Sequence, residues 1–200
     1  VIHGGAGADT LNGGVGVDWV TYANSARAVI VNLATNANGL DAAGDRLLNI
    51  EHVFGTRYAD SITGSTAANQ LRGSEGNDKL DGREGADVLE GGTGADTMIG
   101  GQGIDWADYN ASLSAIRVNL ATNANGGGAA GDFLQSIENV GGTAFADVIT
   151  GDAQANFLDG AAGNDTMSGG NGNDRISGGA GSDSLNGGDG IDVLAYTYRI

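Results

Sequence analysis

The sequence predicts an all-β fold: a parallel β-roll, a kind of β-helix or solenoid, in which two nine-residue repeats make each coil. The repeated pattern has glycine at its first and fourth positions and aspartate at its sixth. Its eighth position is apolar between mostly polar neighbours, which is the alternation of a short half-buried strand. Each coil would have a turn on either side, and successive coils would pair in parallel.

The nonapeptide occurs in three groups, and each copy predicts six residues of turn followed by three of strand. Glycine in the turn permits positive φ and a close approach of neighbouring backbones. The copies begin at Gly4, Gly13, Gly73, Gly82, Gly91, Gly100, Gly160, Gly169, Gly178 and Gly187. We expect the eighth-position side chains to fill the interior: Leu11, Val20, Ile62, Leu71, Leu80, Leu89, Met98, Ala107, Ile149, Leu158, Met167, Ile176, Leu185 and Leu194.

The chain also repeats with a longer period of 87 residues, in addition to the nonapeptide. Shifted by this length, Trp19 falls on Trp106, Tyr22 falls on Tyr109, and the segment ATNANG recurs without a gap. Gapless repetition indicates tandem units of one architecture stacked end to end. We therefore predict one continuous roll over residues 1–200, with units at about 14–100 and 101–187 and partial repeats at both ends.

The stretches between residues 18 and 60 and between residues 105 and 147 lack the nonapeptide. Their apolar residues still alternate, as at Val29, Val31 and Leu33, which predicts a strand. We expect each stretch to form about four irregular half-coils that continue the same stack.

The chain is strongly acidic, with a formal net charge of −16, and 38 of its 200 residues are glycine. Such a surface repels nucleic acid and anionic membranes and attracts cations. The absence of cysteine excludes disulfides and thiolate metal sites. No apolar run approaches the roughly 18 residues of a transmembrane segment. Without the twelve sixth-position aspartates the net charge would be only −4, so most of the charge excess lies in one phase of one repeat.

These aspartates are candidate calcium ligands. One turn offers a single carboxylate and a few carbonyl groups, fewer than the 6–8 oxygens that Ca²⁺ prefers, whereas two turns stacked on the same side can supply them. A spacing of two repeats pairs Asp78 with Asp96, Asp87 with Asp105, Asp165 with Asp183 and Asp174 with Asp192. Weaker candidates, whose upstream loops lack the full glycine set, pair Asp60 with Asp78, Asn69 with Asp87, Asp147 with Asp165 and Asn156 with Asp174. Asp9 and Asp18 are expected to pair with loops outside this segment.

The full set of candidate metal-binding residues joins these side chains to the glycines of the turns. It comprises Asp9, Asp18, Asp60, Asn69, Gly73, Gly76, Asp78, Gly82, Gly85, Asp87, Gly91, Gly94, Asp96, Gly100, Gly103, Asp105, Asp147, Asn156, Gly160, Gly163, Asp165, Gly169, Gly172, Asp174, Gly178, Gly181, Asp183, Gly187, Gly190 and Asp192. The interior gains only one aliphatic side chain per nonapeptide, so calcium binding must supply much of the folding energy. We expect a largely disordered metal-free chain.

The repeated GGxGxD pattern resembles the RTX (repeats-in-toxin), hemolysin-type calcium-binding repeat family, over nearly the whole chain. The resemblance implies a parallel β-roll that binds several Ca²⁺ ions and folds after export by type I secretion from a Gram-negative bacterium. It implies a secreted or cell-surface protein, such as a large adhesin or surface-layer protein, with calcium as cofactor. From the residues themselves we expect no catalytic residue in this segment.

Functions other than a calcium-stiffened spacer are less consistent with the sequence. Catalysis is disfavoured, because the chain has only His3 and His52 and no HExxH or GxSxG motif. A carbohydrate-binding module, like those attached to alginate epimerases, remains an alternative, because Trp19 and Trp106 occupy outward positions and could stack on sugar rings. Partners would then be extracellular polysaccharide, or neighbouring copies of the chain.

Overall fold

The fold is all-β and mostly parallel, which confirms the predicted fold class. The structure is a computed structural model that describes residues 1–195. It divides into two compact units, residues 1–105 and residues 106–200. Across the described residues no helix is long and apolar enough to cross a membrane.

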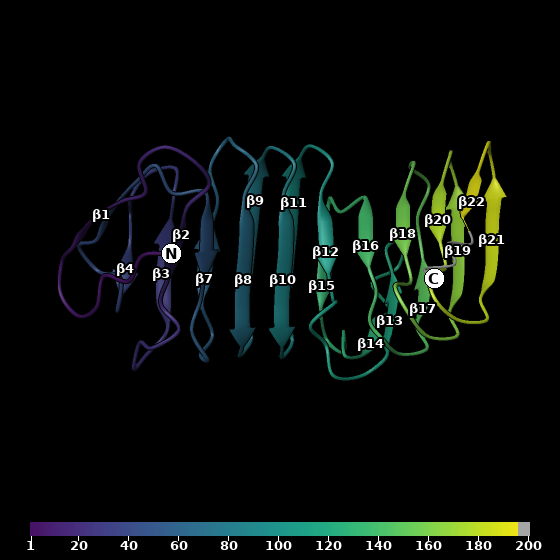
Figure 1. Ribbon diagram of the computed structural model, residues 1–200, viewed down its shortest axis with the longest axis horizontal. Helices are drawn as coiled ribbons and strands as arrows, with labels where there is room; N and C mark the ends of the chain where they lie inside the picture. Colours follow the sequence, from purple (N-terminus) through teal and green to yellow (C-terminus); the bar gives the residue numbers. More distant parts are fainter. Residues whose placement is uncertain (196–200) are drawn as a thin grey trace. The chain divides into compact units, whose positions relative to one another are not determined.

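Unit 1 contains eleven short strands (Figure 1). They are β1 (Thr10–Asn12), β2 (Trp19–Thr21), β3 (Val29–Asn32), β4 (Gly39–Leu40), β5 (Arg46–Leu48), β6 (His52–Phe54), β7 (Ser61–Thr63), β8 (Gln70–Glu75), β9 (Lys79–Glu84), β10 (Val88–Thr93) and β11 (Thr97–Gln102). One sheet has the order β2-β6-β8-β10, and a second has β4-β3-β7-β9-β11, while β1 and β5 form a separate pair. From β6 to β11 the chain therefore alternates between two sheets, one strand in each, as a roll requires.

Unit 2 repeats this arrangement over its described residues. Its strands are β12 (Trp106–Asp108), β13 (Ile116–Asn119), β14 (Gly126–Gly127), β15 (Phe133–Gln135), β16 (Asn139–Gly141), β17 (Val148–Thr150), β18 (Phe157–Asp159), β19 (Thr166–Asn171), β20 (Arg175–Ser177), β21 (Ser184–Asp189) and β22 (Val193–Ala195). One sheet runs β12-β16-β18-β20-β22 and the other β14-β13-β17-β19-β21.

The strand register confirms a coil of two repeats in the nonapeptide runs. Strands β8 and β10 lie side by side in parallel, with Leu71 opposite Leu89 (Figure 1). Strands β9 and β11 do the same, with Leu80 opposite Met98. Because the partners are two repeats apart, each eighth-position side chain lies directly above its equivalent in the preceding coil.

The eighth-position side chains form the core, as predicted. From Val20 to Ile176 each is almost completely buried, and Leu11 is 7% exposed. Leu185 is half-buried and Leu194 is exposed. These two lie in β21 and β22, the last described strands of their sheets, which have no further described strand to cover them.

Replacing Leu89 by alanine should destabilise the calcium-bound fold by roughly 2–5 kcal/mol, because it leaves a cavity in a narrow core. Leu89 is fully buried between the two sheets. Thermal unfolding in calcium measures the effect. The neighbouring Val88→Ala is the control, since Val88 is only half-buried on the outer face and should lose less than about 1 kcal/mol. Equal losses in the two variants would place Leu89 outside the core.

The segment without nonapeptides departs from the four successive half-coils that we predicted. Strand β4 pairs antiparallel with β3, so the two form a hairpin rather than two half-coils. The chain then turns back, and β5 pairs in parallel with β1, the first strand of the unit. Next, β6 pairs with β2, and the regular alternation resumes. In unit 2 the hairpin recurs between β13 and β14.

Candidate metal sites

The sixth-position aspartates form ladders in which each carboxylate contacts the turn one coil earlier. The main-chain N–H of Asp60 donates to Asp78 Oδ1 (2.7 Å), and that of Asp78 donates to Asp96 Oδ1 (2.8 Å). The same bond, at 2.7–3.1 Å, joins Asn69 to Asp87, Asp87 to Asp105, Asp147 to Asp165, Asp165 to Asp183, Asn156 to Asp174 and Asp174 to Asp192. All eight pairs expected from the spacing are thus neighbours in space. Their role as ligands stays a prediction.

The second carboxylate oxygen distinguishes these aspartates from ordinary turn residues. In Asp78, Asp87, Asp165 and Asp174, Oδ2 is buried and has no hydrogen-bond partner. Asp9 Oδ2 is in the same condition. A buried charged oxygen is costly unless it is neutralised or bound to a cation. These oxygens are therefore the strongest candidates for metal ligation.

A further oxygen lies next to each of these carboxylates. A methyl group added to Gly73 would overlap Asp78 Oδ2 and would lie 2.6 Å from the carbonyl oxygen of Gly91, in the next coil. A methyl group on Gly82 would likewise overlap Asp87 Oδ2 and lie 2.8 Å from the Gly100 carbonyl oxygen. The first-position glycines thus leave room for a cradle of oxygens contributed by two turns.

The chemistry of this cradle fits calcium. Ca²⁺ takes oxygen ligands from carboxylates and main-chain carbonyls in flexible geometry. Within residues 1–195 no three His, Cys, Asp or Glu side chains gather closely enough to hold a metal ion. A calcium site in these turns would therefore need main-chain carbonyl oxygens as well as carboxylates.

The remaining glycines of the candidate set lie in the same turns. As at Gly73, an added methyl group would meet the aspartate of the same loop at Gly91, Gly160, Gly169, Gly178 and Gly187. The fourth-position residues all have φ between 112° and 148°, the region that favours glycine: Gly76, Gly85, Gly94, Gly103, Gly163, Gly172, Gly181 and Gly190. Asp183 and Asp192, in the last described coil, are half-buried.

The electrostatics of the ladders favour protonation in the absence of a cation. Burial, together with the nearby carboxylates of Asp96 and Asp60, raises the pKa of Asp78 to about 7, although the N–H of Asp60 opposes the rise. Burial likewise raises the pKa of Asp87 to about 6 and that of Asp165 to about 6. In the metal-free fold these groups therefore hold their protons more tightly than in the unfolded chain.

Acid should consequently stabilise the metal-free fold. Because the pKa values of Asp78, Asp87 and Asp165 are raised on folding, the folded state binds more protons, and its stability should increase as the pH falls through about 7 to 4. Circular dichroism of the metal-free chain should show more β-structure at about pH 5 than at about pH 8. The apparent calcium affinity should fall over the same range, because protons compete for the ligands. A metal-free spectrum independent of pH would contradict this expectation.

The two turns that precede the nonapeptide runs at Gly73 and Gly160 differ from the turns within those runs. Asp60 Oδ2 accepts the N–H of Thr56 (2.6 Å), and its Oδ1 accepts the Thr56 hydroxyl (2.9 Å) and the Val29 N–H (2.8 Å). Asn69 Oδ1 accepts the N–H of Ser65 (2.6 Å), and its Nδ2 donates to the Glu51 carbonyl (2.7 Å). Asp147 and Asn156 hold the same places in unit 2, so these four residues already have partners within the protein.

Asp9 and Asp18 find partners inside the chain, contrary to the expectation that they pair with loops outside it. The N–H of Asp9 donates to Asp45 Oδ1 (2.9 Å), and that of Asp18 donates to Glu51 Oε2 (2.9 Å). Asp45 comes directly before the returning strand β5 and Glu51 follows it, and the nonapeptide spacing gives no indication of this arrangement.

The asparagines of the repeated ATNANG segment form a second group of structurally important polar residues, which the sequence patterns did not identify. Their side chains bond to main-chain groups of the irregular segment. Asn38 Oδ1 accepts the Asn32 N–H (2.8 Å), and its Nδ2 donates to the Asp45 carbonyl (2.9 Å). Asn36 Oδ1 accepts the Leu47 N–H (2.6 Å). Asn123 and Asn125 make corresponding contacts in unit 2. The identity of the hexapeptide in both units was the signal that could have revealed them.

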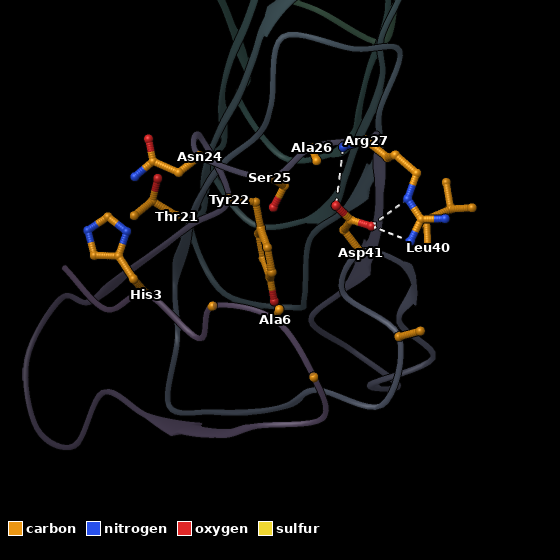
Figure 2. Close-up of a pocket in the computed structure, with 13 residues that line it drawn as sticks. His3, Ala6, Thr21, Tyr22, Asn24, Ser25, Ala26, Arg27, Leu40 and Asp41 are labelled. Carbon is orange, nitrogen blue, oxygen red and sulfur yellow. Dashed lines mark hydrogen bonds and ion pairs between the residues drawn. The ribbon is translucent and has the colours of Figure 1, made fainter.

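Unit 1 also carries a pocket of about 790 Å³ apart from the ladders. Figure 2 shows His3 and Asn24 on one side of it and the ion pair of Arg27 with Asp41 (2.8 Å) on the other. One long period after Arg27 and Asp41 the chain has Ser114 and Gly128, so the ion pair is not part of the repeated architecture.

Comparison with known families finds a match over the nonapeptide runs. A model of the RTX calcium-binding nonapeptide repeat matches residues 1–22, 54–89, 72–107, 141–176 and 159–194. Together these ranges cover more than half of the chain, and they include every nonapeptide run. A comparison with curated proteins finds no match.

Proposed function

Because the chain belongs to the family of RTX calcium-binding nonapeptide repeats, we propose that it is a calcium-binding structural module of a larger secreted or cell-surface bacterial protein. It would order on binding Ca²⁺ after export by type I secretion, and would serve as a rigid spacer or surface-assembly element. Repeats of this family are typically structural rather than catalytic, and we propose no reaction for this segment.

The observation that carries the proposal is the row of buried carboxylate oxygens without protein partners. Asp78 and Asp87 each direct one oxygen to the preceding turn and leave the other beside a carbonyl oxygen of the next coil. Stacked carboxylates repel one another, so this arrangement needs either protons or cations. At neutral pH in a calcium-rich medium, calcium would fill that role, and extracellular modules typically bind it at roughly 10⁻⁴–10⁻³ M.

Circular dichroism of the whole chain tests the proposal. Calcium should produce a cooperative gain of β-structure, EGTA should reverse it, and magnesium at the same concentration should not replace calcium, because Mg²⁺ demands a tighter octahedral site. A spectrum that is the same in calcium and in EGTA would refute calcium-dependent folding.

A carbohydrate-binding role receives less support from the outer face. The Trp19 ring lies 4.8 Å from the His52 ring, and the Arg72 guanidinium lies 5.3 Å from the centre of Trp19. In unit 2 Trp106 packs edge-on against Phe157 at 5.1 Å. Cross-strand stacking of this kind stabilises a sheet by itself. Both tryptophans are half-buried, and we therefore favour a structural role for them.

A further inference from the structure

In the segments between the nonapeptide runs, buried carboxylates accept hydrogen bonds from protein donors, whereas in the runs several such carboxylates have one oxygen without a partner. We call residues 22–60 and residues 109–147 the joints, and residues 73–105 and 160–192 the calcium runs. In the first joint Asp45 is buried, its Oδ1 accepts the Asp9 N–H (2.9 Å), and its Oδ2 accepts the Tyr22 hydroxyl (2.9 Å). Burial and the Asp45 carboxylate raise the pKa of Tyr22 well above its ordinary value, so the hydroxyl remains a donor.

Asp60 is the last residue of the same joint, and both of its carboxylate oxygens accept hydrogen bonds from protein donors. Its two oxygens accept three bonds, from Val29 and Thr56, at 2.6–2.9 Å. Asp78 lies at the same depth, since both side chains are 2–3% exposed, yet its Oδ2 has no partner. The difference therefore lies in the donors that the joint supplies rather than in burial.

Unit 2 repeats these contacts. The Tyr109 hydroxyl donates to Asp132 Oδ2 (2.9 Å). Asp147 accepts the Ile116 N–H (2.8 Å), the Thr143 N–H (2.6 Å) and the Thr143 hydroxyl (2.9 Å). Each of these distances equals its counterpart in the first joint, although only part of the surrounding sequence is identical.

The joints also have a denser apolar core. Seven apolar side chains, counting that of Tyr22, are buried in the first joint, residues 22–60, and three in the first calcium run, residues 73–105. The joint and the calcium run of unit 2 bury seven and two. Apolar burial is the main favourable contribution to folding, so the joints gain more stability from it than the runs do.

We infer that the two joints are calcium-independent folded elements, held by their protein donors and apolar cores, from which the calcium runs become ordered when the ions bind. The inference rests on the proposed calcium function of the runs. It confines the ions to turns whose carboxylates have a buried oxygen without a protein partner. It also divides the chain into alternating stretches of which only every second one responds to calcium.

Hydrogen exchange of the full 200-residue chain, read by mass spectrometry in calcium and in EGTA, tests this inference. In EGTA, peptides from residues 73–105 and 160–192 should exchange as an unfolded chain does. Peptides that cover β3, β5 and β6, and their counterparts β13 and β16, should stay protected. If the joints lose protection together with the runs, the inference is overturned and the proposed calcium function stands. If the runs also stay protected in EGTA, the proposed function itself is overturned.

A matched set of variants tests the donors. Thr56→Val removes the hydroxyl bond to Asp60 and should lower the protection of the first joint in EGTA about tenfold, whereas Thr56→Ser should restore it. Thr93→Val changes the same side chain at an exposed position in a calcium run and is the control. The three variants should bind as many calcium ions as the parent chain. Equal protection in Thr56→Val and Thr93→Val would overturn the role given to the joint's donors.

Discussion

Replacing Gly94 by alanine should cause a large loss of stability in unit 1. Gly94 has φ of 144°, a conformation that costs other residues about 1–2 kcal/mol. The added methyl group would also overlap the carbonyl oxygen of Gly76 in the coil below. The coils would have to separate, which would weaken the pairing of β10 with β8. We expect a total loss of roughly 3 kcal/mol or more in calcium, measured by thermal or denaturant unfolding.

The first repeat supplies a matched control for the steric part of this loss. Gly7 holds the same fourth position and has φ of 117°, but a methyl group there would meet no atom within 4 Å. Gly7→Ala should therefore lose only the conformational part, about 1–2 kcal/mol. If the two substitutions lowered the free energy of unfolding equally, the coils at Gly94 would not be stacked in close contact.

Replacing Asp87 by asparagine should weaken calcium binding without disrupting the fold. Asp87 lies between Asn69 and Asp105, so its turn would contribute to the sites on both sides. The amide oxygen can still accept the Asn69 N–H, whereas the NH₂ group cannot bind a cation. Asn69 itself shows that asparagine fits this position of a coil. We expect the affinity of the adjacent sites to fall by at least 10- to 100-fold, measured by calorimetric titration.

Glu84→Ala is the control for the loss of charge. Glu84 is the last residue of β9, three residues before Asp87, and its side chain is exposed. Removing it should change calcium affinity by much less, because exposed charges are screened. An unchanged midpoint and stoichiometry in Asp87→Asn would contradict the idea that neighbouring sites share a turn.

The regular part of the fold could be predicted because its interactions are periodic. The coil length, the parallel register and the buried eighth positions all follow from the nonapeptide pattern, as Leu71 and Leu89 illustrate. The joints could not be predicted in this way. The hairpin of β3 with β4 and the return of β5 to β1 depend on side-chain bonds such as that of Asn36 to Leu47, which no periodicity indicates.

The candidate sites were predictable to a similar degree. The spacing of two repeats identified which acidic side chains become neighbours, from Asp78 to Asp174. It could not tell that Asp60 is already satisfied by Thr56 and Val29, because Val29 lies far back along the chain, in the irregular segment. The sequence thus located the ladders, whereas the structure shows where the protein supplies its own donors.

Anomalous X-ray scattering from crystals of the chain grown in calcium would test the central claim most directly. Ions are expected between successive turns on the same side, within bonding distance of the Oδ2 atoms of Asp78, Asp87, Asp165 and Asp174 and of carbonyl oxygens in the adjacent coil. No ion is expected at Asp60 or Asp45, whose oxygens already accept protein hydrogen bonds. Anomalous peaks only at exposed carboxylates such as Glu84, with none between the turns, would contradict the account.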